Sequence, residues 1–157
     1  MSIYMKYDAI TGDVTETGHK DWIECHSFQW GVGRALSSTV GSSADRESTA
    51  PSVGQVTVTK DNDVATGKLM AEALGGHGKT VKIDFVRTDK GKLDVYLSLE
   101  LTNTLISDYS MGGSDRPGES LTLSFTKVAF STKQMKDDAT EGQNFTSTYD
   151  LETAQLT

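Results

Sequence analysis

Residues 93–102 alternate strictly between aliphatic and polar or amphipathic side chains. The aliphatic positions are Leu93, Val95, Leu97, Leu99 and Leu101, and those between them are Asp94, Tyr96, Ser98, Glu100 and Thr102. Successive side chains of a strand point to opposite faces, so this run predicts a strand with one apolar face and one wet face. Such strands build half-buried antiparallel sheets, whereas the parallel sheets of nucleotide-binding enzymes use strands that are apolar throughout.

Further runs of alternating apolar and polar residues predict more strands, each bounded by turn residues. These runs cover residues 2–8, 22–30, 53–60, 80–88, 103–111, 120–131 and 145–151. The Asp-Lys-Gly sequence at 89–91 predicts a hairpin into the Leu93 strand. The run at 120–131 changes phase, which predicts a β-bulge near Thr126 or Lys127.

One segment, about residues 62–75, has the pattern of an α-helix. Its apolar positions recur at helical spacing and are Ala65, Leu69, Met70, Ala73 and Leu74. The acidic and amide residues at 61–63 offer N-caps, and Gly75-Gly76 supplies a C-terminal stop. We therefore predict a mainly β fold, an antiparallel β-barrel or sandwich of about eight or nine strands with one α-helix.

A long segment between two predicted strands, residues 37–52, shows no periodicity and is rich in Ser, Ala, Gly and Thr. Loops of this length are uncommon inside a compact domain and are usually functional or disordered. With 157 residues, the chain is most simply one domain, 1–157, that carries this loop on its surface.

Charge and hydropathy exclude several classes of partner. The net charge of −7 disfavours binding to nucleic acid or to an anionic membrane surface, because both are polyanions. No apolar run approaches the ~20 residues that span a bilayer, so no membrane insertion is expected. The N-terminus lacks the basic and apolar regions of a secretory signal, so the chain is expected to fold in the cytoplasm.

The chain also lacks a recognisable catalytic or metal-binding motif. Residues 73–80 read Ala-Leu-Gly-Gly-His-Gly-Lys-Thr, but a phosphate-binding loop follows a strand and precedes a helix, which is the reverse of the order predicted here. The three histidines lack ligand spacing, and the single cysteine, Cys25, has no catalytic context and is expected to be a buried thiol. No catalytic, cofactor-binding or metal residue is therefore predicted, although carboxylates that meet only in the fold stay open.

Taken in order, several segments resemble the haemolysin-coregulated protein (Hcp) family of bacterial type VI secretion. They are Gly18-His-Lys-Asp-Trp-Ile-Glu24, Ser27-Phe-Gln-Trp-Gly31, Val58-Thr-Lys60 with the helix through Leu69, the Thr80–Thr88 strand, Gly112-Gly-Ser-Asp-Arg-Pro117 with Glu119 and the following Leu-x-Leu-x-Phe strand, and Thr148-Tyr-Asp-Leu151. Single segments are weak signals, but their shared order covers nearly the whole chain.

The resemblance implies a structural protein without catalysis or cofactor. Family members form hexameric rings of small β-barrels that stack into a hollow tube, which a contractile sheath pushes out behind a spike protein. Some members hold effector proteins in the ring lumen. The resemblance further implies that the chain, after folding in the bacterial cytoplasm, is secreted by the type VI system.

Two surfaces are candidates for assembly contacts. The first is the loop at 37–52, predicted to contact the next ring through Ser37, Ser42, Ser43, Asp45, Arg46, Glu47 and Pro51. The second is the wet sheet face, predicted to be a solvated wall or a subunit contact and formed by Asp94, Tyr96, Ser98 and Glu100.

Two alternative functions stay open at this point. One is the tube protein of a phage tail or of a phage-derived contractile particle, which shares the architecture. The other is a small ligand-binding β-barrel, in which Tyr96 and Tyr109 would be exposed among polar groups.

Overall fold

The computed structural model describes residues 1–38, 46–48, 50–89, 91–135 and 141–157. The N-terminal half contains β1 (Ser2–Tyr7), the short 3-10 helix η1 (Thr17–His19), β2 (Ile23–Cys25), β3 (Ser27–Gln29), β4 (Val32–Gly33), β5 (Leu36–Ser38), β6 (Arg46–Ser48), β7 (Ser52–Val53) and β8 (Val56–Asp61). The rest contains α1 (Thr66–Gly75), β9 (Lys79–Asp89), β10 (Lys92–Gly112), β11 (Gly118–Ser124), β12 (Lys127–Met135), β13 (Glu141–Asp150) and β14 (Gln155–Leu156).

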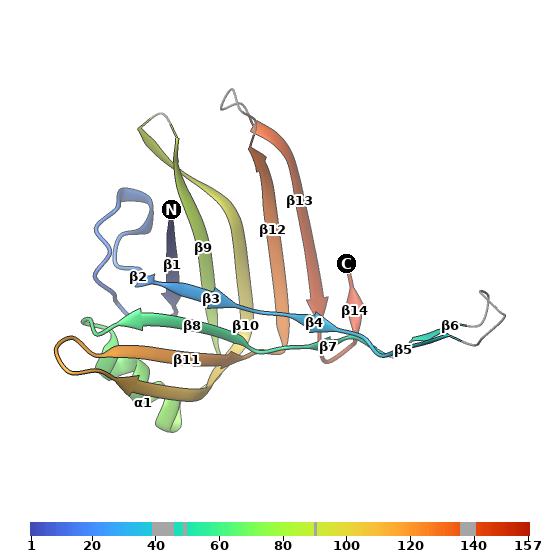
Figure 1. The fold of residues 1–157 in the computed structure, drawn as a ribbon, viewed down its shortest axis with the longest axis horizontal. Helices are drawn as coiled ribbons and strands as arrows, with labels where there is room; N and C mark the ends of the chain where they lie inside the picture. Colours follow the sequence, from blue (N-terminus) through green and yellow to red (C-terminus); the bar gives the residue numbers. More distant parts are fainter. Residues whose placement is uncertain (39–45, 49, 90, 136–140) are drawn as a thin grey trace.

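The strands form two antiparallel layers that share β10. One layer has the order β2-β1-β9-β10-β12-β13-β14, and the other has the order β10-β11-β8-β3. In Figure 1, β9, β12 and β13 rise from a second group of strands, β3, β8 and β11, that runs across them, with α1 below. The predicted mainly β antiparallel fold with one helix is confirmed, and its layers have the arrangement of a sandwich.

The structure describes more strands than predicted, because two predicted strands are interrupted and because the short strands β4, β5, β6, β7 and β14 were not predicted, whereas the 93–102 and 103–111 runs form the single strand β10. The 22–30 run divides at His26 into β2 and β3, which pair in different layers. The 120–131 run divides at residues 125–126, near the predicted bulge, into β11 and β12. Both of these strands pair with β10, and the chain passes from one layer to the other at the division.

A β-bulge in β10 corrects the predicted apolar face of residues 93–102. Val95 pairs with Val86 and Leu97 pairs with Phe85, so Tyr96 is an extra residue. Directly paired residues lie on one face of a sheet, and one extra residue exchanges the faces. Leu97 therefore faces the main core, together with Leu99 and Leu101, while Val95 lies on the opposite face.

The prediction of one continuous aliphatic face is thus wrong at its N-terminal end. Leu93 shares the face of Val95 and is 42 % exposed. Val95 packs against a small second cluster that contains Tyr4, Val14 and Val86. The loop before β2 therefore has an apolar anchor on the outer face of the sheet.

The main core lies between the two layers and α1. Its fully buried members include Met5, Ile23, Val58, Leu69, Ile83, Leu101, Leu121 and Leu123. Cys25 is buried among them, as predicted, and burial raises the pKa of its thiol to about 12.

The helix begins later than predicted, at Thr66, because residues 63–66 form a hydrogen-bonded turn. The Asp63 Oδ1 atom accepts from the Ala65 N–H (2.9 Å), and the Thr66 hydroxyl accepts from the Asp63 N–H (3.0 Å). The predicted apolar stripe is buried only in part, because Ala65 and Leu69 are fully buried whereas Met70 and Leu74 are exposed, Leu74 by 84 %.

A buried ion cluster joins β8 and β11 to the turn before α1. The Lys60 Nζ atom lies 2.6 Å from Glu119 Oε2 and 3.0 Å from Asp63 Oδ1, and the Lys60 and Glu119 side chains are fully buried. Lys60 and Glu119 are directly paired across β8 and β11. Both stand in phase with the buried valines and leucines of their strands, so they project into the core.

Two hydroxyl groups also donate hydrogen bonds to the Glu119 carboxylate. The Thr66 hydroxyl donates to Glu119 Oε2 (2.9 Å), and the Tyr109 hydroxyl donates to Glu119 Oε1. Burial, followed by the hydrogen bond to Glu119, raises the pKa of Tyr109 above its ordinary value. The cluster thus connects β8, α1, β10 and β11.

Replacing Lys60 tests how strongly this cluster stabilises the fold. Lys60→Met leaves Glu119 buried without its cation, so we expect a loss of about 3–5 kcal/mol in the free energy of unfolding. Guanidinium unfolding followed by circular dichroism measures this loss. The control is Lys82→Met, because Lys82 and Glu100 form a half-exposed pair at 4.0 Å that is expected to contribute less than ~1 kcal/mol. Equal effects of the two substitutions would contradict the account.

Candidate functional site

The predicted loop at 37–52 belongs to an arm that extends away from both layers (Figure 1). β4 pairs with β7, and further out β5 pairs with β6 in a two-stranded sheet of their own. The structure places Ser37 in β5, opposite Glu47 in β6, and places Arg46 beside Glu47 in β6. The other predicted contact residues of the outer arm, Ser42, Ser43 and Asp45, lie outside the described residues.

The base of the arm is held by tight backbone contacts. The Gly54 N–H donates to the Gly31 carbonyl (2.8 Å), and the Trp30 indole N–H donates to the Gly54 carbonyl (3.0 Å). A Cβ atom on Gly54 would lie 2.8 Å from the Gly31 oxygen, so this approach requires glycine.

An apolar groove of about 580 Å³ lies beside the base of the arm. β4 and β7 contribute Val32 and Val53 to its wall, with Pro51 next to them. Opposite wall residues come from β12, β13 and β14 and include Phe130, Tyr149 and Leu156. Arg34 is the one charged side chain among the described residues that line it. Val32 and Leu156 are 54 % and 68 % exposed, so the groove is open to solvent.

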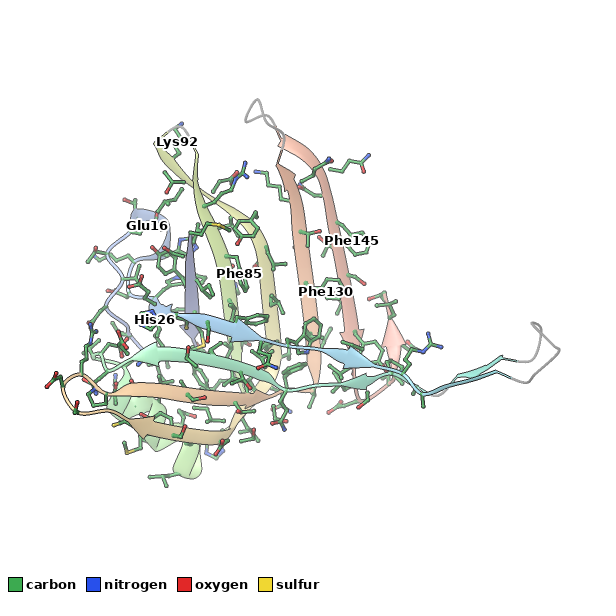
Figure 2. All side chains as sticks on the ribbon, viewed as in Figure 1. Glu16, His26, Phe85, Lys92, Phe130 and Phe145 are labelled. Atoms are coloured by element: carbon green, nitrogen blue, oxygen red, sulfur yellow. The ribbon has the colours of Figure 1, made fainter. Side chains whose placement is uncertain are left out.

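Aromatic side chains continue from the groove across the inner face of the sheet. The ring centroids of Phe130 lie 6.2 Å from Trp30 and 6.3 Å from Phe145. In Figure 2, Phe130 and Phe145 lie next to each other on β12 and β13, above the crossing strands. Phe145 is 59 % exposed, so the second layer leaves this part of the inner face uncovered. We call Phe130, Phe145 and the groove the open apolar face.

The bulge in β10 separates the four residues of the predicted wet face. Ser98 and Glu100 pair with Asp84 and Lys82 on the outer face. Asp94 and Tyr96 lie on the inner side, where Tyr96 contacts Phe85 with 6.2 Å between ring centroids and Asp94 lies 3.4 Å from Lys133 Nζ. The sequence alternation cannot show this separation because it contains no sign of the extra residue.

Ser98 takes part in a chain of polar contacts on the outer face. The Ser98 hydroxyl donates to Asp84 Oδ1 (2.7 Å), and Asp84 Oδ2 lies 2.8 Å from His19 Nε2. The other ring nitrogen of the buried His19 lies 2.6 Å from Glu16 Oε2. The Ser98 hydroxyl is bonded to the carboxylate and not to the imidazole, so the arrangement lacks the nucleophile–base contact of a hydrolase. These polar contacts attach the loop that contains η1 to the outer face of the sheet.

The glycine-rich segment after α1 has the helix-then-strand order expected from the sequence. α1 ends at Gly75 and β9 begins at Lys79, whose Nζ donates to Glu72. A Cβ atom on Gly78 would lie 1.7 Å from Asn103 Oδ1. The segment therefore packs closely against β10, and a larger residue here would require the Asn103 side chain to move.

Within the described residues, no group of three or more His, Cys, Asp or Glu side chains is arranged to hold a metal ion. No helix in the described part of the chain has the length and hydropathy needed to cross a membrane.

The model of the family described as "Type VI secretion system effector, Hcp" matches residues 4–131. The chain belongs to the Hcp family. Membership confirms the resemblance seen in the sequence and, at the level of the family, the predicted role in the type VI secretion tube. No curated protein sequence matches the chain.

Solved structures of Hcp-family and type VI secretion proteins share the fold. A structure described as a type six secretion system protein has 25 % identity and a TM-score of 0.90, covering 99 % of each chain. Hcp1 from Salmonella typhimurium has 21 % identity and a TM-score of 0.75, covering 99 % of this chain and 98 % of that one. A type VI secretion system effector from Yersinia pestis has 24 % identity and a TM-score of 0.73, covering 94 % and 98 %.

The residues of the ion cluster were not among the site residues predicted from the sequence of this Hcp-family chain, and of the groove lining only Pro51 was predicted, as part of the 37–52 loop. The sequence does contain a sign of the cluster, because Lys60 and Glu119 are charged residues at positions that the alternation of Val58 and Leu121 assigns to the buried face. The groove has no comparable signal, since its walls come from strands that are distant in the sequence.

The contacts of His19 predict a pH-dependent stability through Glu16. The Gly18 N–H and then His19 lower the pKa of Glu16 below its ordinary value of 4.5. The stabilising contribution of Glu16 is therefore fully present above pH 4.5 and is lost as the pH falls through the folded-state pKa.

We expect Glu16→Gln to lower the urea midpoint at neutral pH, with the difference from wild type narrowing at acid pH. Urea unfolding across this range measures the difference. Asp115→Asn, at an exposed position in the 113–117 turn, is the control and should show no such convergence. A difference in urea midpoint between Glu16→Gln and wild type that stays constant with pH would contradict this role of Glu16.

Proposed function

We propose that this Hcp-family chain is a structural subunit of the secretion tube. Copies close into a hexameric ring, rings stack into a hollow tube, and the lumen accommodates effector proteins. The spike protein and the contractile sheath are its further partners, and the chain folds in the bacterial cytoplasm before secretion. In this role residues 1–157 act as one domain, without catalysis, cofactor, nucleic acid or membrane insertion.

The observation that carries this proposal is the combination of the open apolar face with the arm. Exposed aromatic and aliphatic side chains that gather beside a groove are typical of protein–protein contacts. A two-stranded hairpin such as β5–β6 is marginally stable in water by itself, so its packing against another copy would stabilise it. Contacts between two different surfaces of one chain close rings or continue as filaments, which are the two levels of a tube.

The alternative of a small ligand-binding barrel is weakened by the position of Tyr109. Its ring packs against the main core and its hydroxyl donates to the buried Glu119, so it does not offer an exposed platform. The likeness to Hcp proteins also favours secretion over a phage tail as the setting of the tube.

Oligomeric state tests the proposal directly. Size-exclusion chromatography with light scattering should give the mass of a hexamer at micromolar concentration, because the open apolar face is then covered by neighbouring copies. Dilution should produce smaller species if the contacts are reversible. A strict monomer at high concentration would contradict the proposal.

The arm supplies a second prediction, that it connects successive rings. Replacing residues 37–47 by a short glycine linker keeps Pro51 and Val53 at the groove and should leave folded hexamers. Stacking of rings, seen by negative-stain electron microscopy, should be weaker because the contact to the next ring is lost. Glu152→Gln, a single exposed change near the C-terminus, is the control. Unchanged tube formation by the shortened chain would contradict this role.

A further inference from the structure

A second exposed apolar surface lies on α1. Val64, Met70 and Leu74 are 61 %, 39 % and 84 % exposed, although Leu69 and Ala65 of the same segment are fully buried. Met70 and Leu74 are four residues apart, so they share one face of the helix. We call Val64, Met70 and Leu74 the helix patch.

The helix patch and the groove lie on different sides of the molecule. Figure 1 shows α1 on one side of the body, and β4, β7 and β14 on the other, next to the arm. One chain therefore cannot join its own two surfaces. A head-to-tail ring requires two different surfaces of this kind on every copy.

The charges of the two surfaces also complement each other. The last turn of α1 has no basic side chain, and the carbonyl groups at the C-terminal end of a helix carry a partial negative charge. Arg34 lines the groove and is exposed. A guanidinium group donates to several oxygen atoms at once, which suits it to a helix C-terminus.

We propose that the last turn of α1 from one copy docks in the apolar groove of the next copy. Leu74 enters between Val32 and Leu156, and Arg34 donates to the terminal carbonyl groups of the helix. This inference rests on the proposed function, because the docking of α1 would be the contact between neighbouring copies within the proposed ring. A second copy is preferred over a cargo protein because every copy carries both the exposed helix patch and the apolar groove with Arg34 in its lining, so the same contact can repeat from copy to copy.

Disulfide trapping tests this contact, because the native Cys25 is buried and does not compete. Val32→Cys and Leu74→Cys are prepared as single variants and as a double variant, and each is oxidised under mild conditions. Neither single variant should link to itself. A mixture of the two should give disulfide dimers, and the double variant should give a ladder of linked chains up to the hexamer.

The matched control replaces Leu74→Cys by Leu93→Cys. Leu93 is also an exposed leucine, 42 % accessible, but it lies at the β9–β10 hairpin, away from α1. The combination of Val32→Cys with Leu93→Cys should give no ladder. Equal linking by both combinations would show random collision and overturn the inference.

The remaining outcomes separate this inference from the proposed function. Hexamers by light scattering that give no ladder would overturn the docking of α1 and leave the ring standing. Self-linking of Val32→Cys or of Leu74→Cys would show like-to-like packing and also overturn it. A monomer at every concentration would overturn both proposals.

The contact of Arg34 is tested in the same double variant. Arg34→Glu should slow disulfide linking several-fold, and Arg34→Lys should restore part of the rate. An unchanged rate would overturn the assigned contact of Arg34.

Discussion

β10 determines how the rest of the molecule is arranged. It is 21 residues long, and it pairs with β9 and β12 along its first half and with β11 along its second half. Both layers therefore contain the same strand, and their relative orientation follows from its course. Register shifts occur near Tyr96, between Leu101 and Thr104, and between Ile106 and Asp108, where extra residues increase the local twist. The first shift turns Tyr96 and Asp94 inward and leaves Ser98 and Glu100 outside.

The buried charges hold the crossing strands to the helix. Lys60 and Glu119 lie opposite each other at the ends of β8 and β11, where the turn before α1 brings in Asp63. A pair of this kind stabilises little relative to apolar residues, but removing one partner is costly. Through Asp63 and Thr66 the cluster connects the start of α1 to these strands, with Leu69 in the core and the helix patch outside. The outer-face contacts of His19 play a comparable part for the loop before β2.

The fold class could be predicted from the sequence because alternation, turn residues and one helical stripe each report local structure. The hairpin between β9 and β10 and the burial of Cys25 followed from such signals, whereas the family resemblance rested on the order of several segments along the chain. The bulge at Tyr96 did not, since an inserted residue leaves the alternation of residues 93–102 intact and becomes visible only against β9. The groove could not be predicted either, because Trp30, Phe130 and Leu156 meet only after the strands have paired. The exposure of Leu74 depends on which part of the helical stripe the sheet covers.

In the proposed ring, the open apolar face of each copy is covered by another copy of the same chain. High-resolution electron microscopy of the assembled rings tests it most directly, because the density shows what covers Phe130, Phe145 and the groove. We expect side-chain density from a neighbouring copy in the groove of every subunit, with the same contact repeated around the ring. Rings in which the groove faces solvent, with subunits joined through other surfaces, would contradict it.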